Sequence, residues 1–150
     1  MITAARVQRI YSNSMEPDVE WRLPAKLFMM LANYFNMEVR VSPYFFADGK
    51  YDDVDESAIM AVVNSDRTDE VPYEAEFFDC DDFSYSLMGA LHKDARTARM
   101  PVFLTWVRLA DGFYHAVVSY PIGDGVKIIE PQNDFIFDLP DCWKLNLLCG

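Results

Sequence analysis

Three side chains of this 150-residue sequence have the types needed for nucleophilic chemistry: Cys80, His115 and Glu130. A thiol can attack an acyl carbon, an imidazole can take the thiol proton, and a carboxylate can orient the imidazole. Cys80 lies in the run Phe-Asp-Cys-Asp-Asp-Phe at residues 78–83, and the other two residues follow in that order. The sequence therefore predicts a Cys-His-Glu site for acyl transfer.

The predicted nucleophile stands at the beginning of a helix. Apolar residues follow it at helical spacing, at positions 83, 87, 90 and 91, and Asp79 with Asp82 resembles an acidic N-terminal cap. Unpaired amides at a helix start stabilise a thiolate and can donate to an oxyanion. Asp79, Asp81 and Asp82 oppose this, because nearby negative charge raises the pKa of a thiol. The sequence thus predicts a thiol that is poorly activated unless a cation neutralises these carboxylates.

The predicted base and its orienting partner lie on two strands joined by a turn. Residues 112–120 and 126–130 are rich in aromatic and β-branched side chains, and residues 102–107 form a strand before them. If residues 121–124 form a four-residue loop, His115 lies directly opposite Glu130, with Cβ atoms about 5 Å apart. A five-residue loop makes Pro131 the neighbour of His115, and a bulge could rescue either arrangement. The sequence leaves these alternatives open.

The second histidine is excluded as the base. His92 follows Cys80 by twelve residues on the same predicted helix, which separates the two by about 18 Å along the helix axis. His115 is therefore the candidate base.

Helices are predicted mainly before these strands. Residues 24–35 and 56–63 have helical patterns, and a short strand at 38–41 and a final strand and closing element within 135–149 complete the expectation. We therefore predict an α+β fold, with the Cys80 helix packed on an antiparallel sheet that carries His115 and Glu130. Residues 1–150 are expected to form one domain, helical to about residue 100 and sheet from about residue 101.

Composition excludes several classes of protein. The formal net charge of −11 argues against binding to nucleic acid or to anionic membranes. The longest apolar stretch, residues 27–37, is too short to span a bilayer. Three cysteines do not indicate a disulfide framework, and Cys142 and Cys149 could pair only if the chain turns back between them. Because no signal segment is visible, a reducing, cytoplasmic location is expected.

The motifs around the three site residues resemble a known family. Residues 78–83, the run His-Ala-Val at 115–117 and the run Ile-Glu-Pro-Gln-Asn at 129–133 look like the papain-like C-terminal protease domain of mushroom agglutinins. More loosely, their order resembles transglutaminase-like cysteine peptidases. The resemblance covers about residues 74–134 and implies a papain-like thiol protease, a hydrolase that depends on calcium. It makes Cys80, His115 and Glu130 the catalytic triad.

The same resemblance implies a metal site. It makes Asp81, Gln132 and Asn133 candidate ligands, and oxygen ligands of this kind suit calcium or manganese. A bound cation would also offset the carboxylates beside Cys80. The chain departs from the family in two ways: it has no room for a sugar-binding domain, and no glutamine precedes Cys80 to complete an oxyanion hole.

The resulting functional prediction is a cysteine peptidase or amidase that acts on a peptide or protein. An acyltransferase of the transglutaminase type, with an amine in place of water, is the alternative among enzymes. The alternative from another class is a non-catalytic papain-like binding or assembly module, and a globular domain with a merely buried Cys80 is the simplest reading. Substrate specificity and oligomeric state are not predicted.

Overall fold

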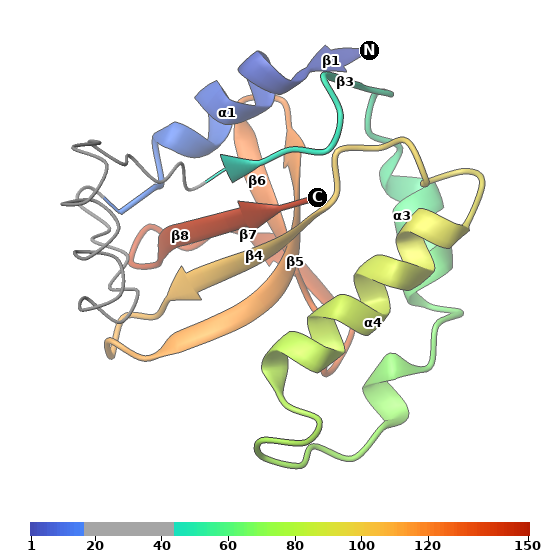
Figure 1. Cartoon of the computed structure of the whole chain (residues 1–150), viewed down its shortest axis with the longest axis vertical. Helices are drawn as coiled ribbons and strands as arrows, with labels where there is room; N and C mark the ends of the chain where they lie inside the picture. The colour runs from blue at the N-terminus through green and yellow to red at the C-terminus, as the bar shows by residue number, and fades with distance from the viewer. Residues whose placement is uncertain (17–43) are drawn as a thin grey trace, which may run out of the picture.

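A six-stranded sheet forms the centre of the molecule (Figure 1). The structure, a computed structural model, describes residues 1–16 and 44–150. Its sheet has the order β2-β8-β4-β5-β6-β7, and β1 and β3 pair in a separate two-stranded sheet. The elements are β1 (Ile2–Thr3), α1 (Ala4–Ser12), β2 (Tyr44–Phe45), β3 (Lys50–Tyr51), α3 (Glu56–Val63), the 3₁₀ helix η1 (Thr68–Glu70), α4 (Cys80–Lys93), β4 (Phe103–Arg108), β5 (Tyr114–Ile122), β6 (Gly125–Glu130), β7 (Phe135–Asp138) and β8 (Lys144–Cys149).

The predicted fold class, a papain-like α+β fold with an antiparallel sheet, is wrong. The large sheet has six strands and is mixed, because β2 runs parallel to β8. The prediction failed because β1, β2 and β3 all lie in the first 51 residues, which were expected to be mainly helical. The last strand, β8, also returns to the interior of the sheet between β2 and β4.

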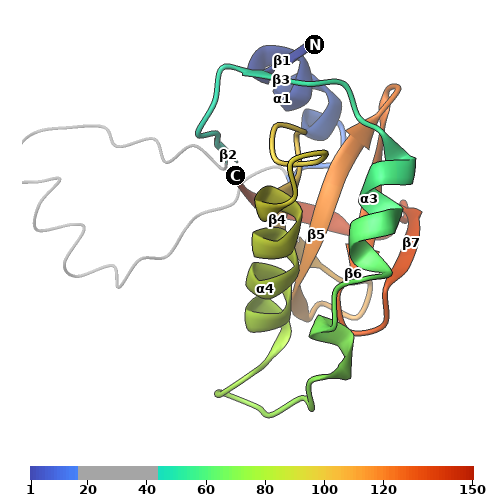
Figure 2. The ribbon, with the colours of Figure 1, turned by 90° about the vertical axis from the view of Figure 1, so that its right-hand side faces the viewer.

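Both faces of the large sheet are covered. Along β5, Val117 belongs to an apolar cluster with α1, whereas its neighbour Val118 belongs to a second cluster with α3 and α4. Ile128 and Ile129 alternate in the same way on β6. Figure 2 shows α3 and α4 together in front of the sheet. The continuous apolar character of β5 is therefore explained by burial on two sides.

Buried polar side chains fasten α1 to the sheet. The hydroxyl groups of Tyr11 on α1 and Ser119 on β5 form a hydrogen bond of 2.9 Å, and Thr105 on β4 reaches the same Ser119 hydroxyl at 2.6 Å. All three residues are buried. Because each hydroxyl has a partner, the polar atoms add specificity to this side of the core at little cost.

Several elements predicted from the sequence are confirmed. The helix at 56–63 matches α3, and the helix expected near Asp79 is α4 with Asp79 at its N-cap. The three central strands lie within two residues of their expected bounds. All three cysteines are free. The predicted helix at 24–35 and strand at 38–41 lie outside the described residues.

None of the helices in residues 1–16 and 44–150 combines the length and the apolar character needed to cross a membrane.

Candidate functional site

The first turn of α4 presents Cys80 toward the sheet. The carboxylate of Asp82 accepts a hydrogen bond from the backbone N–H of Asp79 at 3.3 Å, which ties down the N-terminus of the helix. Ser84 donates to the Cys80 carbonyl at 2.8 Å. The backbone N–H of Ala116, next to His115 on β5, donates to the Cys80 thiol. The structure thus brings Cys80 to the strand segment that carries the predicted base.

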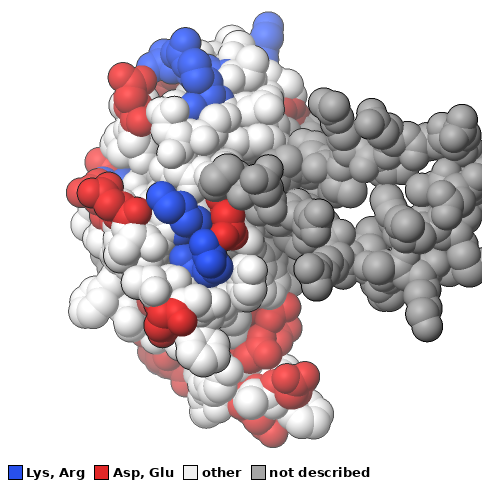
Figure 3. All heavy atoms as spheres, turned by 90° about the vertical axis from the view of Figure 1, so that its left-hand side faces the viewer, with Lys and Arg blue, Asp and Glu red and all other residues white. Residues whose placement is uncertain are grey.

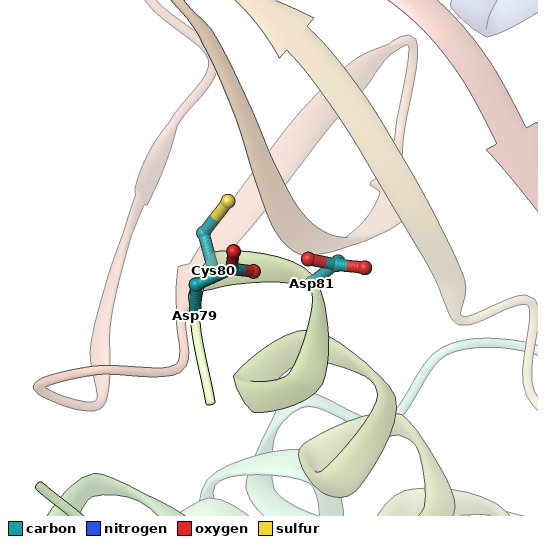
Figure 4. Close-up of side chains that lie close together, drawn as sticks. All are labelled: Asp79, Cys80 and Asp81. Carbon is teal, nitrogen blue, oxygen red and sulfur yellow. The ribbon is translucent and has the colours of Figure 1, made fainter. Parts of the chain in front are cut away.

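The thiol of Cys80 is held in its neutral form. Partial burial raises its pKa, and the charges of Asp79 and Asp81 raise it further, while the hydrogen bond from Ala116 acts in the opposite direction. Figure 4 shows the Cys80 sulfur and the two carboxylates gathered around the start of the helix. The conflict between helix start and aspartates predicted from the sequence is therefore present, and the raising effects are larger.

His115 and Glu130 meet directly. Their Nε2 and Oε2 atoms are 2.7 Å apart, and both side chains are partly buried. The backbone N–H of Gln132 also donates to the other oxygen of Glu130, at 3.3 Å. These two contacts fix the carboxylate beside the imidazole, and the orienting role of Glu130 stays a prediction.

The register of the β5–β6 hairpin differs from both registers predicted from the sequence. The β5–β6 pairs run from Val118 opposite Ile129 to Ile122 opposite Gly125, so the loop contains only Gly123 and Asp124. The four-residue and five-residue loops are both wrong. Continuing this register by one residue past the Val118–Ile129 pair places Glu130 opposite Val117, two residues from His115. Diagonal neighbours of this kind share a face and lie within reach of long side chains.

Two carboxylates beside Cys80 share a hydrogen bond. This hydrogen bond raises the pKa of Asp81 and lowers the pKa of Asp79. The other oxygen of Asp79, Oδ1, is buried without a hydrogen-bond partner among the described residues. Asp79 therefore keeps an unused acceptor beside the thiol.

Of the three predicted metal ligands, only Asp81 belongs to a cluster of possible ligand atoms in the described residues. Asp79, Cys80 and Asp81 offer ligand atoms that lie within 4.8 Å of one another. The unpartnered oxygen of Asp79 is the ligand type that calcium takes, and the sequence analysis did not include Asp79 in the metal set. Asn133 uses its side-chain oxygen to accept a hydrogen bond from the backbone N–H of Phe135 at 3.1 Å. The set of Asp81, Gln132 and Asn133 stays a prediction.

Exposed aromatic side chains accompany each of the three site residues. Phe77, Phe113 and Phe135 are the most exposed aromatic residues that the structure describes, at 78%, 71% and 69%. Phe77 and Phe113 precede Cys80 and His115 by three and two residues. Phe135 pairs with Glu130 across β6 and β7. These three residues were not among the predicted site residues, although each lies close to one of the three motifs in the sequence.

We call this region the thiol end and define it as Phe77, Cys80, Phe113, His115, Ala116, Glu130 and Phe135.

The neutral thiol predicts slow alkylation of Cys80. At pH 7.5 iodoacetamide should label Cys80 at least about fivefold more slowly than the exposed Cys142, because only the thiolate reacts. The Cys80 rate should keep rising with pH through its raised pKa. Mass spectrometry of labelled peptides measures both rates, with calcium-free and calcium-loaded samples compared. A Cys80 rate equal to or above that of Cys142 without calcium would contradict the raised pKa, and an unchanged rate with calcium would remove the metal prediction.

Comparisons with known proteins find similarity in structure only. No family model and no curated protein matches the sequence. A solved structure described as "PSL1a-E64 complex" has a TM-score of 0.72 and 19% identity, over 99% of this chain and 51% of that one. A crystal structure of Polyporus squamosus lectin bound to human-type influenza-binding epitope Neu5Aca2-6Galb1-4GlcNAc has a TM-score of 0.57 and 22% identity, over 71% and 41%. The chain therefore spans about half the length of these proteins or less and shares the fold of part of them.

These neighbours correct the predicted function. They are lectin structures, so similarity to a mushroom lectin is confirmed at the level of the fold. The papain-like protease character has no support in these comparisons, and the assignment as a hydrolase and cysteine protease is withdrawn.

Proposed function

We propose that this chain is a binding module and that its ligand lies on the thiol end. The observation that carries the proposal is the placement of the three most exposed aromatic side chains, one beside each of Cys80, His115 and Glu130. Exposed aromatic residues that surround a few polar groups are typical of ligand sites. The similarity in fold to part of a lectin supports binding as the function.

The state of the thiol supports binding without catalysis. A nucleophilic cysteine needs a lowered pKa or a base that takes its proton, whereas burial and two carboxylates raise the pKa of Cys80. In this proposal two site residues supply hydrogen bonds to a ligand: the imidazole of His115 and the Glu130 carboxylate. The aromatic rings supply apolar contact area.

NMR titration of the amide signals tests this proposal. Two probes are used separately: the oligosaccharide Neu5Aca2-6Galb1-4GlcNAc and an octapeptide of alternating lysine and glycine. We expect at least one probe to shift the signals of Cys80, Ala116 and Phe135. The double variant Phe77→Ser/Phe113→Ser should weaken that binding at least about tenfold, because each ring contributes roughly 1 kcal/mol.

Two control variants separate binding from chemistry and from general effects. Cys80→Ser should keep the affinity within about twofold, because the proposal gives the thiol no covalent role. Met60→Ser removes an apolar side chain that is 50% exposed on α3 and should leave the affinity unchanged. Shifts that gather away from the thiol end, or no shifts with either probe, would overturn the proposal.

An acyltransferase of the transglutaminase type is the second candidate. The contact of 2.7 Å between His115 and Glu130, together with the Ala116 N–H at the thiol, favours it. The thiol would attack a carboxamide carbon and release ammonia, and an amine would then displace the thiol from the acyl group. Incorporation of a fluorescent primary amine into a glutamine-containing peptide, lost in Cys80→Ala, would support this candidate. Absence of incorporation would exclude it.

A further inference from the structure

The negative charge of the chain is concentrated beside the thiol end. Residues 66–82 contain eight acidic residues and one basic residue, so this segment carries seven of the eleven net negative charges. We call it the acidic segment. Among the described residues, its only ion pair joins Arg67 to Glu70. Acidic residues elsewhere have cationic partners more often: Asp52 pairs with Arg99, Asp94 with Arg96 and Asp138 with Lys127.

The acidic segment adjoins two parts of the thiol end, the one around Cys80 and the one around Glu130. It includes Phe77 and leads directly into Cys80 at the start of α4. Its residues Asp66 and Asp69 also act on Asp134 in the turn after Glu130: burial and these two charges raise the pKa of Asp134 to about 6. The segment therefore lies along both the helix start and the β6–β7 turn. Its charge therefore acts near two of the exposed rings, Phe77 within the segment and Phe135 next to Asp134.

The figures place this charge at one end of the molecule. In Figures 1 and 2 the segment forms the lower end, below the start of α4. In Figure 3 the lower part of the visible surface shows acidic and uncharged residues, and the visible basic residues lie higher. The acidic segment therefore lies at the end of the molecule where α4 begins, and Phe77 is one of its residues.

We infer that the partner of the thiol end is a cationic polypeptide segment, rich in Lys or Arg. The inference rests on the proposed function and adds the chemical class of the ligand. Lys and Arg side chains bind the faces of aromatic rings and are attracted by carboxylates that have no cationic partner. A surface of one sign also steers an oppositely charged partner and raises its association rate. Phe77 and Phe113 supply the rings, and the acidic segment supplies the charge.

The same charge argues against an anionic ligand at this surface. An oligosaccharide that ends in Neu5Ac carries a carboxylate, which would approach seven net negative charges on the acidic segment. Like charges brought together without a cation oppose binding. Between a glycan of this kind and a cationic peptide, the surface favours the peptide.

Calorimetric titration of the full chain with three probes tests the inference. The probes are the alternating lysine-glycine octapeptide, a glutamate-glycine octapeptide of equal length, and the oligosaccharide Neu5Aca2-6Galb1-4GlcNAc. The lysine peptide should bind at least about tenfold more tightly than either other probe, because only its charge is complementary. Its affinity should fall about threefold or more between 50 and 300 mM salt, because salt screens exposed charges.

Matched substitutions locate the charge that matters. Asp69→Asn/Glu74→Gln neutralises two carboxylates of the acidic segment and should weaken the lysine peptide about threefold to tenfold. The matched control Asp48→Asn/Asp124→Asn neutralises two exposed carboxylates outside the acidic segment and should have no effect. Equal binding of the lysine and glutamate peptides, or equal weakening by both sets of substitutions, would overturn the inference.

The three probes also distinguish failure of the inference from failure of the proposed function. In one outcome the oligosaccharide or the glutamate peptide binds as tightly as the lysine peptide, and Phe77→Ser/Phe113→Ser abolishes that binding. This outcome supports the proposed binding function and overturns the inference of a cationic partner. No binding with any of the three probes overturns both.

Discussion

Replacing Leu87 with alanine should lower the free energy of unfolding by about 3–4 kcal/mol. Leu87 lies on α4, is fully buried and belongs to the apolar cluster between the helices α3 and α4 and the sheet. Truncation removes apolar contact area and leaves a cavity, because the well-packed neighbours Val118 and Ile129 relax only in part. Urea unfolding followed by circular dichroism measures the loss.

The same variant should loosen the site. Leu87 fixes α4 on β5, and that packing holds the Cys80 thiol at the Ala116 amide. Local opening of the helix start should therefore increase the alkylation rate of Cys80 about threefold or more under native conditions. Leu87→Ile keeps the volume and serves as the control for cavity formation. A loss below about 1 kcal/mol in Leu87→Ala would show that α4 is not anchored by this residue.

Replacing Phe103 with alanine should lower the free energy of unfolding by about 3–5 kcal/mol. Phe103 is fully buried on the opposite face of the sheet. Its ring centroid lies 5.8 Å from that of Tyr11 on α1, 5.7 Å from Tyr51 on β3 and 5.3 Å from Phe46 after β2. One ring therefore joins three segments from the first third of the chain to β4, and its removal deprives all of them of contacts.

The location of Phe103 gives this variant a distinct signature. Because its cluster lies across the sheet from α4, the alkylation rate of Cys80 in the folded protein should stay within about twofold of the wild-type rate. Phe103→Leu retains much of the apolar volume and should lose about half as much stability or less. A large increase in Cys80 labelling in Phe103→Ala would contradict independent packing of the two faces.

Local patterns predicted the elements better than the way they assemble. The helix at 56–63 was visible from its helical pattern, and the structure adds its cap: Asp55 accepts hydrogen bonds from the backbone N–H groups of Ser57 and Ala58. The parallel pair of β2 and β8 was not predictable, because β2 contains only two residues and its partner follows about 100 residues later. That pair makes the sheet mixed.

The site was also predicted only in part, because local patterns indicate which strand face a residue lies on but not which residues the rest of the chain covers. Side chains alternate along β5 and β6, so His115 and Glu130 share a face whenever the residue numbers of directly opposed pairs add up to an odd number. This condition holds both for the predicted four-residue loop and for the observed two-residue loop, so the two side chains meet although the predicted loop length was wrong. The exposure of Phe77, Phe113 and Phe135 was missed, because aromatic residues are usually expected in the core. Exposure depends on what the rest of the chain covers, which the local pattern does not contain.

The tight hairpin and the strand that follows it restrict the insertions and deletions that this chain can accept. Gly123 has a φ of 59°, which residues other than glycine rarely adopt. This value suits the first position of a tight hairpin turn. Deleting one residue between Gly125 and Glu130 would send the Glu130 side chain to the opposite face of the sheet, away from His115. Deletions of two would restore the face. Length variation among descendants of this sequence should therefore accumulate in other loops, and this strand should retain its length wherever the His115–Glu130 pair is retained.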